Sequence, residues 1–482
     1  MINIRFVINL IGKLLLIESV CFLICTFIAL FYGESDADAF LYSAIITTAI
    51  SILIWTFVKA KEKVLARKDG YFIVTMVWIA FSLFGCLPYL FAGTIPSFID
   101  AFFETMSGFT TTGATILDQI EALPHATLFW RSLTQWLGGL GIAVLFLAIL
   151  PSLGIEGRDL YMAEVTGPTH HKMASTFYNT SRILWLFYLL LTVVAAILLF
   201  FGGMEPFDAI CHSFTTLATG GFSTKQASIA HWDSPFIHYV IAIFMVIASS
   251  NLVLCYAAFT GKAKKIIKDE EFRWYMLLIF GATLIITTGL YISGWGGLEK
   301  SFRDAFFQVT SIISSSGFAS VDYLLWPGLL SAILLLYMFI GGCAGSTAGG
   351  MKVVRIGLLF KNSFDEMKRI IHPNAVINVR YNNKTVHPNI MSGVSAFFIL
   401  YIIMFFMGSI VMSLFTNDFA TACSSVVTSL SNIGPGFGSV GPTNSYSHLP
   451  DFAKMFLAFL MLIGRLEIYT VIVLFTKTFW RK

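Results

Sequence analysis

Long apolar stretches recur along this chain of 482 residues, and shorter polar segments separate them. Ten stretches approach or exceed the length of about 20 residues that a helix needs to cross a bilayer. Their apolar runs are continuous and lack the alternation of a lipid-facing barrel strand. The pattern predicts an all-α polytopic membrane protein with spans at residues 10–31, 40–58, 71–92, 126–150, 183–203, 235–260, 272–294, 327–345, 390–415 and 452–476.

Four shorter segments between the spans each begin as an apolar helix and end in Ser, Thr and Gly; they cover 98–115, 206–223, 302–319 and 419–438. Aligned on one glycine, each has an alanine twelve residues earlier, a hydroxyl six residues earlier and a large apolar residue four residues earlier. The glycines are Gly113, Gly221, Gly317 and Gly434, although the adjacent Gly220 leaves the second register open. This internal repeat predicts four units of span, short helix, glycine turn and span, preceded by an extra helix pair.

A single turn such as "SGFTTTGAT" at 107–115 is equally typical of an ordinary loop, but four copies favour a pore. Irregular backbone at membrane depth is tolerated only where protein buries it or water reaches it. Glycine accepts positive φ and lets backbone carbonyls point at a shared axis, where they can replace the hydration shell of a monovalent cation. The C-terminal ends of four short helices favour a cation there as well. The predicted cation-binding filter consists of Thr110, Thr111, Thr112, Gly113, Ala218, Thr219, Gly220, Gly221, Ser314, Ser315, Ser316, Gly317, Ser431, Asn432, Ile433 and Gly434.

Composition and charge agree with a membrane protein and suggest its orientation. Only 12% of the residues are charged, against about 25% in soluble chains. Lys and Arg gather at 59–70, 261–273 and 350–389 and are absent from 33–39 and 416–453. Because Lys and Arg mark cytoplasmic loops, we expect both termini to be cytoplasmic and the four turns to face outside.

The first apolar segment lacks a small-residue cleavage site and is expected to be a retained helix rather than a signal peptide. The seven cysteines are scattered without a metal or disulfide spacing. Most acidic residues outside the spans are typical of a solvated surface, but Glu104 lies within the first short helix and is the best candidate to add negative potential. His212 lacks a plausible base or metal set, so a membrane-embedded enzyme is a weak hypothesis.

Two features interrupt predicted spans. The run "GGCAGSTAGGMK" at 341–352 cannot hold a regular helix cheaply, since an interior glycine costs about 1 kcal/mol relative to alanine. A phosphate-binding loop lacks its Gly-Lys-Ser/Thr order here, and a close helix contact through small residues is the other alternative. Arg465 is a charge within the last span, and Glu467 lies on a different helix face. A charge in this position marks function or a buried pair, with snorkelling as the alternative.

The four turns "SGFTTTGAT", "LATGGFST", "SSSGFAS" and "SNIGPGFGS" make the chain resemble TrkH-like subunits of the Trk/Ktr/HKT superfamily of potassium transporters. The resemblance covers essentially the whole chain, including the leading helix pair that the Ktr core lacks. It is looser in the fourth turn, where Asn432 and Ile433 replace hydroxyls. It is also looser at 163–176, where His170 and His171 stand in a stretch that departs from the family pattern.

The resemblance implies a potassium-conducting, channel-like uptake subunit of the bacterial inner membrane, not an enzyme. Gly113 in the first turn goes with potassium preference in this family. The loop below the filter would be the gate, with Gly341, Gly342, Gly345, Ser346, Thr347, Gly349, Gly350 and Lys352, and with Arg465 as electrostatic barrier and loop anchor. The resemblance also implies a homodimer in membrane lipid and a cytosolic TrkA-like ring of nucleotide-binding subunits. The chain itself would bind no cofactor and no nucleic acid, and potassium would be its substrate.

The repeat and the resemblance together divide the chain into a helix pair at 1–70 and four repeats at 71–180, 181–270, 271–385 and 386–482. The alternative function is a secondary transporter that couples a cation to another solute or to protons or sodium. Such folds often use inverted repeats, whereas the four turns predicted here all lie on one side of the membrane.

Overall fold

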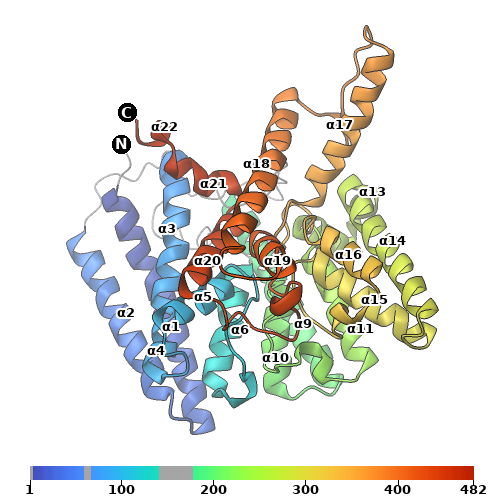
Figure 1. Ribbon diagram of the computed structural model, residues 1–482. Helices are drawn as coiled ribbons and strands as arrows, with labels where there is room; N and C mark the ends of the chain where they lie inside the picture. The colour runs from blue at the N-terminus through green and yellow to red at the C-terminus, as the bar shows by residue number, and fades with distance from the viewer. Residues whose placement is uncertain (1–3, 59–66, 140–176, 482) are drawn as a thin grey trace.

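The structure, a computed structural model, describes residues 4–58, 67–139 and 177–481, and in this part of the chain helices dominate (Figure 1). By length and hydropathy six helices can cross a membrane, or up to eight if each of two bent pairs counts as one span, among the described residues. The basic stretch at 59–66, the chain at 140–150 and the segment 163–176 with His170 and His171 lie outside the described residues.

The long helices follow the predicted spans closely. They are α1 (Ile4–Tyr32), α2 (Ala37–Phe57), α3 (Arg67–Gly85) with its continuation α4 (Leu87–Ala92), α9 (Phe177–Phe201), α14 (Glu270–Ile292) and α18 (Pro388–Met412). The spans predicted at 126–150 and 327–345 correspond to shorter helices, α6 (His125–Gly139) and α16 (Gly328–Tyr337). The described part of α6 ends at Gly139, and α16 ends because the glycine-rich run follows it.

Two predicted spans are broken sharply. The first consists of α11 (Pro235–Ala248), α12 (Leu252–Ala257) and η4 (Ala258–Lys262), bent by 106°. The second consists of α20 (Asp451–Arg465), α21 (Ile468–Ile472) and η7 (Val473–Phe475), bent by 115°. At the first break Asn251 restarts the helix, because its side chain accepts hydrogen bonds from the amides of Val253 and Leu254.

Each repeat contains one short helix, and each of these ends four residues before an aligned glycine. They are α5 (Phe98–Phe109), α10 (Pro206–Leu217), α15 (Leu298–Ile313) and α19 (Phe419–Leu430). Ser97 and Asp418 cap α5 and α19 through their side chains, and Pro206 starts α10 at a position where its missing amide costs nothing. Every short helix packs between the span before it and the span after it. The described helices thus follow one another in the order long helix, short helix, turn and second helix.

The remaining elements are small, apart from one long amphipathic helix, α17. They are η1 (Ile120–Ala122), η3 (Ser228–His231), α13 (Lys264–Lys268), η5 (Tyr323–Leu325), α17 (Val353–Ile371), β1 (Arg380–Tyr381), β2 (Lys384–Thr385), η6 (Gly438–Val440) and α22 (Lys477–Trp480). Strands β1 and β2 form an antiparallel hairpin. Its two central residues, Asn382 and Asn383, have φ of 49° and 60°. Positive φ at both positions is what a two-residue hairpin loop requires, and asparagine tolerates it.

The basic parts of the chain gather at one end of the molecule. Figure 1 shows both ends of the described chain, α13 and the outer half of the projecting α17 at that end. The hairpin packs beside the first half of α17, where Tyr381 lies in one cluster with Val354 and Leu358. The charge pattern predicts this common side, because Lys and Arg concentrate in these segments.

Separate hydrophobic clusters hold the molecule together. One joins the α1–α2 pair to the helices of the first and last repeats, and two others are centred on α9–α11 and on α14–α16. Large apolar side chains such as Phe27, Phe31 and Leu284 point outward from the spans and are at least 60% exposed. An apolar surface of this kind suits contact with lipid.

Candidate functional site: a ring of four turns above a loop

The four turns share one backbone conformation. The residue two positions before each aligned glycine adopts positive φ although it carries a side chain: Thr111 at 54°, Thr219 at 53°, Ser315 at 55° and Asn432 at 53°. The glycines follow at 81°, 78°, 75° and 90° for Gly113, Gly221, Gly317 and Gly434. A left-handed residue with a β-carbon costs about 1–2 kcal/mol. Its recurrence at the same place in all four turns therefore marks a site whose geometry the surrounding structure enforces.

The same hydrogen bonds close each short helix. In the first turn the amide of Thr112 donates to the carbonyl of Ser107 at 2.9 Å, and the amide of Thr111 donates to Gly108 at 3.0 Å. Equivalent pairs recur in the other three turns, with Gly220, Ser316 and Ile433 in the place of Thr112. This is the Schellman pattern, in which a left-handed residue lets the last helical carbonyls find donors. The helix ends and the turns are thus one rigid unit.

The four turns close into a ring through their glycines. A β-carbon added to Gly113 would overlap the carbonyl oxygen of Gly220, the residue before the next glycine. In the same way Gly221 meets the carbonyl of Ser316, Gly317 meets that of Ile433, and Gly434 meets that of Thr112. Each repeat therefore touches the next and the fourth touches the first, so that four glycines and four carbonyls lie around one axis.

The structure settles the register of the second turn. Gly221 has the positive φ of the aligned glycines, whereas Gly220 does not. Gly220 must be glycine for a different reason: a β-carbon there would overlap the side chain of Gln135. The Gln135 amide donates to the Gly220 carbonyl at 2.7 Å and accepts from the Phe222 amide at 3.0 Å. Gln135 thus fixes the second turn through these two hydrogen bonds.

The fourth turn departs from the others in sequence but not in backbone. Asn432 donates from its side-chain amide to the Thr112 hydroxyl and to the Met461 carbonyl, both at 2.9 Å. The Tyr446 hydroxyl donates to the carbonyl of Gly434 at 2.7 Å. The asparagine therefore ties the fourth turn to the first and to α20, where a hydroxyl side chain would be too short.

Glu104 does not present the free charge that we expected from its position in the first short helix. It is buried and forms an ion pair with Arg131 of α6 at 2.9 Å. The same carboxylate accepts from the Thr115 hydroxyl and from the Ile116 amide. The charge of Arg131 offsets the negative potential of Glu104, so its role here is to fix the chain that leaves the first turn.

Arg131 also joins two repeats. Its Nη1 donates to the Ser223 carbonyl at 3.1 Å, and its guanidinium stacks 4.2 Å from the centre of the Phe222 ring. The sequence contained a signal for Arg131, because it lies in a predicted span just as Arg465 does.

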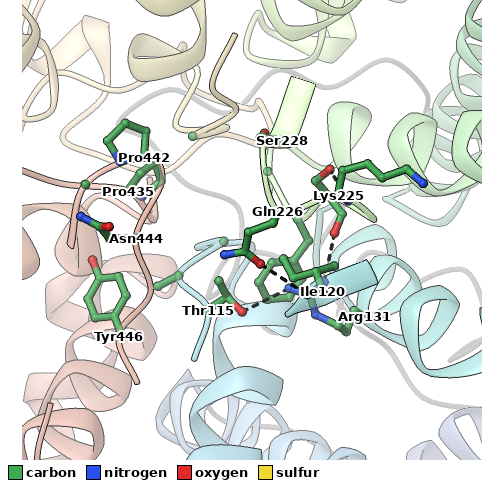
Figure 2. A pocket seen from close by; sticks show the side chains of 17 residues that line it. Thr115, Ile120, Arg131, Lys225, Gln226, Ser228, Pro435, Pro442, Asn444 and Tyr446 are labelled. Atoms are coloured by element: carbon green, nitrogen blue, oxygen red, sulfur yellow. Dashed lines mark hydrogen bonds between the residues drawn. The ribbon is translucent and has the colours of Figure 1, made fainter. Parts of the chain in front are cut away.

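A cavity of about 60 Å³ lies on the side of the ring toward which the chain leaves the turns. Gly113, Gly221 and Gly317 line it. Figure 2 shows Thr115 and Arg131 facing the cavity with the second-repeat side chains, and Asn444 and Tyr446 approaching from the fourth repeat. About 10–15 Å³ of such space suffices for one water molecule, so this cavity has room for more than one small polar group.

The run 341–352 is not helical and lies directly beneath the ring. Gly341, Gly345 and Gly350 have φ of 79°, 72° and 76°. The loop is bonded to the break between α11 and α12, where the Cys343 amide donates to the Ser249 carbonyl at 2.8 Å. This irregular backbone excludes the alternative of a continuous helix with a small-residue contact.

The loop contacts the ring through the left-handed residues. The Gly349 amide donates to the Ser315 hydroxyl at 2.6 Å, and the Thr219 hydroxyl lies 3.3 Å from the Thr347 hydroxyl. A β-carbon on Gly349 would overlap the carbonyl oxygen of Ser431. The side chains two positions before the glycines thus form a lower rim against which the loop rests.

Arg465 connects the loop, the ring and α6. Its Nη1 donates to the Thr347 carbonyl at 2.6 Å and to the Thr111 hydroxyl at 3.1 Å. Its Nη2 donates to the carbonyls of Gly138 and Gly139 at the end of the described part of α6. These inward bonds argue against snorkelling. Glu467 pairs with Arg355 at 2.6 Å. The sequence indicated that Glu467 is a poor partner for Arg465, because the two residues lie on different helix faces.

Lys352, the last residue of the run, is buried and has φ of 68°. Its ammonium donates to the Ala348 carbonyl within the loop. The remaining polar residue of the run, Ser346, donates to the Cys343 carbonyl at 2.6 Å. The loop is therefore held by its own polar side chains as well as by its neighbours.

Known proteins match this chain over nearly its whole length. A sequence model of the TrkH family, described as a cation transport protein, matches residues 37–482. The Trk system potassium uptake protein TrkH of Escherichia coli K12 is 41% identical, with 99% of each chain covered. The related TrkG of the same organism is 36% identical, also with 99% of each chain covered. The crystal structure of the potassium transporter TrkH from Vibrio parahaemolyticus matches with a TM-score of 0.89 at 37% identity and covers 100% of both chains.

The buried pair of Glu104 and Arg131 gives a prediction for stability. Arg131→Met leaves the buried carboxylate without its cation, which lowers the free energy of unfolding by about 3–5 kcal/mol. The double variant Glu104→Gln/Arg131→Met removes both charges and should be more stable than Arg131→Met alone. Apparent melting temperatures of the purified protein in detergent check this. Equal melting temperatures for the single and double variants would show that the unpaired carboxylate of Glu104 does not cause the loss of stability.

Proposed function

The chain belongs to the TrkH family of cation transport proteins, and on that premise we propose that it is the potassium uptake subunit of a Trk system in a bacterial inner membrane. Its relatives are named potassium uptake proteins, and no catalytic family matches among the similar proteins described above. The proposal is channel-like conduction down the electrochemical gradient, through a pore that the ring of four turns surrounds.

The closed ring is the observation that carries this proposal. Four backbone segments with one conformation approach so closely that none of their glycines can bear a β-carbon. We assign the filter to residues 110–113, 218–221, 314–317 and 431–434. Their carbonyl oxygens supply the dipoles that replace the hydration shell of potassium. The ends of α5, α10, α15 and α19 meet at the ring, and their partial negative charges favour a cation over an anion.

The gate is the run 341–352 together with Arg465. The loop lies against the lower rim of the ring, a position in which it obstructs the axis. Arg465 holds the loop through the Thr347 carbonyl and places a positive charge beside it, which opposes the passage of a cation. Opening would break the hydrogen bonds to Ser315 and Thr347 and leave the ring in place, because the ring is held separately by Gln135, Asn432 and Tyr446.

The proposal includes partners and boundaries that follow from family membership. We assign a helix pair to 1–70 and repeats to 71–180, 181–270, 271–385 and 386–482, with both termini in the cytoplasm. α17 projects from the molecule (Figure 1). With its hairpin it carries basic residues and exposed apolar residues. This surface suits contacts with a second copy of the chain and with a cytosolic TrkA-like ring.

Replacing Gly113 tests the filter. Gly113→Ser places a β-carbon against the carbonyl of Gly220 and should reduce rubidium over sodium selectivity by about tenfold, as expected for a cost of 1–2 kcal/mol. Gly93→Ser is the matched control, because Gly93 also has positive φ at 68° but its added β-carbon would meet nothing within 4 Å. Tracer flux into liposomes measures both. Unchanged selectivity in Gly113→Ser, or an equal loss in Gly93→Ser, would contradict the filter assignment.

Replacing Arg465 tests the gate. Arg465→Ala removes both the charge and the bonds to Thr347 and Thr111, so resting rubidium flux should rise about tenfold or more, the factor expected when hydrogen bonds from a charged group are lost. Arg465→Lys keeps the charge but loses the branched geometry that reaches several carbonyls at once. Its resting rubidium flux should therefore lie between that of the unmodified protein and that of Arg465→Ala. Flux in Arg465→Ala equal to or below that of the unmodified protein would contradict a barrier at this residue.

A further inference from the structure

Glu271, in the first turn of α14, is a buried carboxylate that holds the loop at both of its ends. Its Oε1 accepts from the Ala344 amide at 2.7 Å and from the Val354 amide at 3.2 Å. Ala344 lies near the start of the run 341–352, and Val354 lies in the first turn of α17, directly after it. One side-chain oxygen therefore fixes the separation between the two ends of the loop.

These contacts are specific to the loop. Burial of a charged group is expensive unless donors replace its lost water, and two backbone amides of the loop ends donate to Glu271. One helical turn further along the same face of α14, the Tyr275 hydroxyl lies 2.5 Å from the Ser249 hydroxyl. Ser249 is the residue whose carbonyl accepts from Cys343 of the loop. This face of α14 thus holds the loop directly and through the break in α11–α12.

The two acidic residues before Glu271 bind the β1–β2 hairpin. The Asp269 carboxylate accepts from the Asn382 side-chain amide at 2.8 Å. The Glu270 carboxylate accepts from the Asn382 backbone amide at 3.0 Å and pairs with Lys361 of α17. The Glu270 amide donates back to the Asn382 side chain at 2.7 Å. Three consecutive carboxylates therefore connect the tip of the hairpin to the loop.

An apolar contact reinforces the same connection. Tyr381, the residue before Asn382, is buried in a small cluster with Ala344, Val354, Leu358, Val379 and Val394. Two of these residues, Ala344 and Val354, are the ones whose amides Glu271 binds. The hairpin and the ends of the loop thus lie side by side in one packed group.

We propose that Glu271 is a positioning residue for the loop, and that Asp269, Glu270 and Glu271 transmit a displacement of the hairpin to it. The inference rests on the proposed function only for its effect on ion flux; its effect on the loop conformation does not. The competing explanation is that Glu271 merely stabilises the start of α14 as an acidic residue in a first helical turn. That explanation predicts a loss of stability without a specific change in the loop.

The reactivity of Cys343 separates these explanations. Cys343 is 1% exposed and adjoins Ala344, so its labelling by a water-soluble methanethiosulfonate reports release of the loop. In Glu271→Ala we expect its labelling rate, read on its own peptide by mass spectrometry, to rise about tenfold or more, the factor expected when a hydrogen bond to a charged group is lost. Glu271→Gln keeps an acceptor oxygen and should restore most of the protection. Glu366→Ala is the control, because Glu366 is exposed and pairs with Arg369 away from the loop.

Flux into liposomes and a double-variant cycle complete the test. Glu271→Ala should raise resting rubidium flux, and its effect on Cys343 labelling should be non-additive with that of Asn382→Ala, since contacts in one network couple. Unchanged Cys343 labelling in Glu271→Ala, or strictly additive effects with Asn382→Ala, would overturn the inference. Absence of selective rubidium flux in the unmodified protein would instead overturn the proposed function, and the labelling result would still decide the inference.

Discussion

The close approach of four glycines to four carbonyls is the constraint on which the rest of the structure depends. A carbonyl from the next repeat occupies the space where each glycine would carry a β-carbon. The ring of turns therefore closes only if all four short helices end at the same level and all four turns adopt the same left-handed conformation. The chain achieves this by repeating one unit of span, short helix and turn, each time with its own hydrophobic support.

The scaffold around the ring supplies hydrogen-bond partners to the buried polar groups of the turns. Side-chain hydrogen bonds hold three of the turns: those of Gln135 for the second, those of Asn432 and Tyr446 for the fourth, and the Arg131–Glu104 pair for the chain that leaves the first. These supports differ chemically, although the backbone of the turns is nearly the same. The symmetry of the ring therefore lies in the main chain, and the side chains that support it differ from turn to turn.

The sequence predicts the main-chain features well because they recur. Four aligned glycines, alanines and hydroxyls indicate the ring, and consecutive glycines indicate the irregular loop at 341–352. It predicts the supporting side chains poorly, because they bind partners that are far away in the sequence. Gln135 is 85 residues from the carbonyl it binds, and Glu271 is 73 residues from Ala344. Glu104 shows the same limit, since its position suggests a free charge and only the fold reveals that Arg131 pairs with it. Arg465 is an exception, because a charge within an apolar span is conspicuous by itself.

The positions of bound cations show whether the ring of four turns is a cation filter. Crystals of the protein grown with rubidium or thallium in place of potassium can be measured at the absorption edge of the ion. We expect anomalous peaks on the axis of the ring, level with the carbonyls of residues 110–113 and of their counterparts in the other three turns. Peaks confined to other parts of the molecule, with an empty axis at saturating cation concentration, would contradict it.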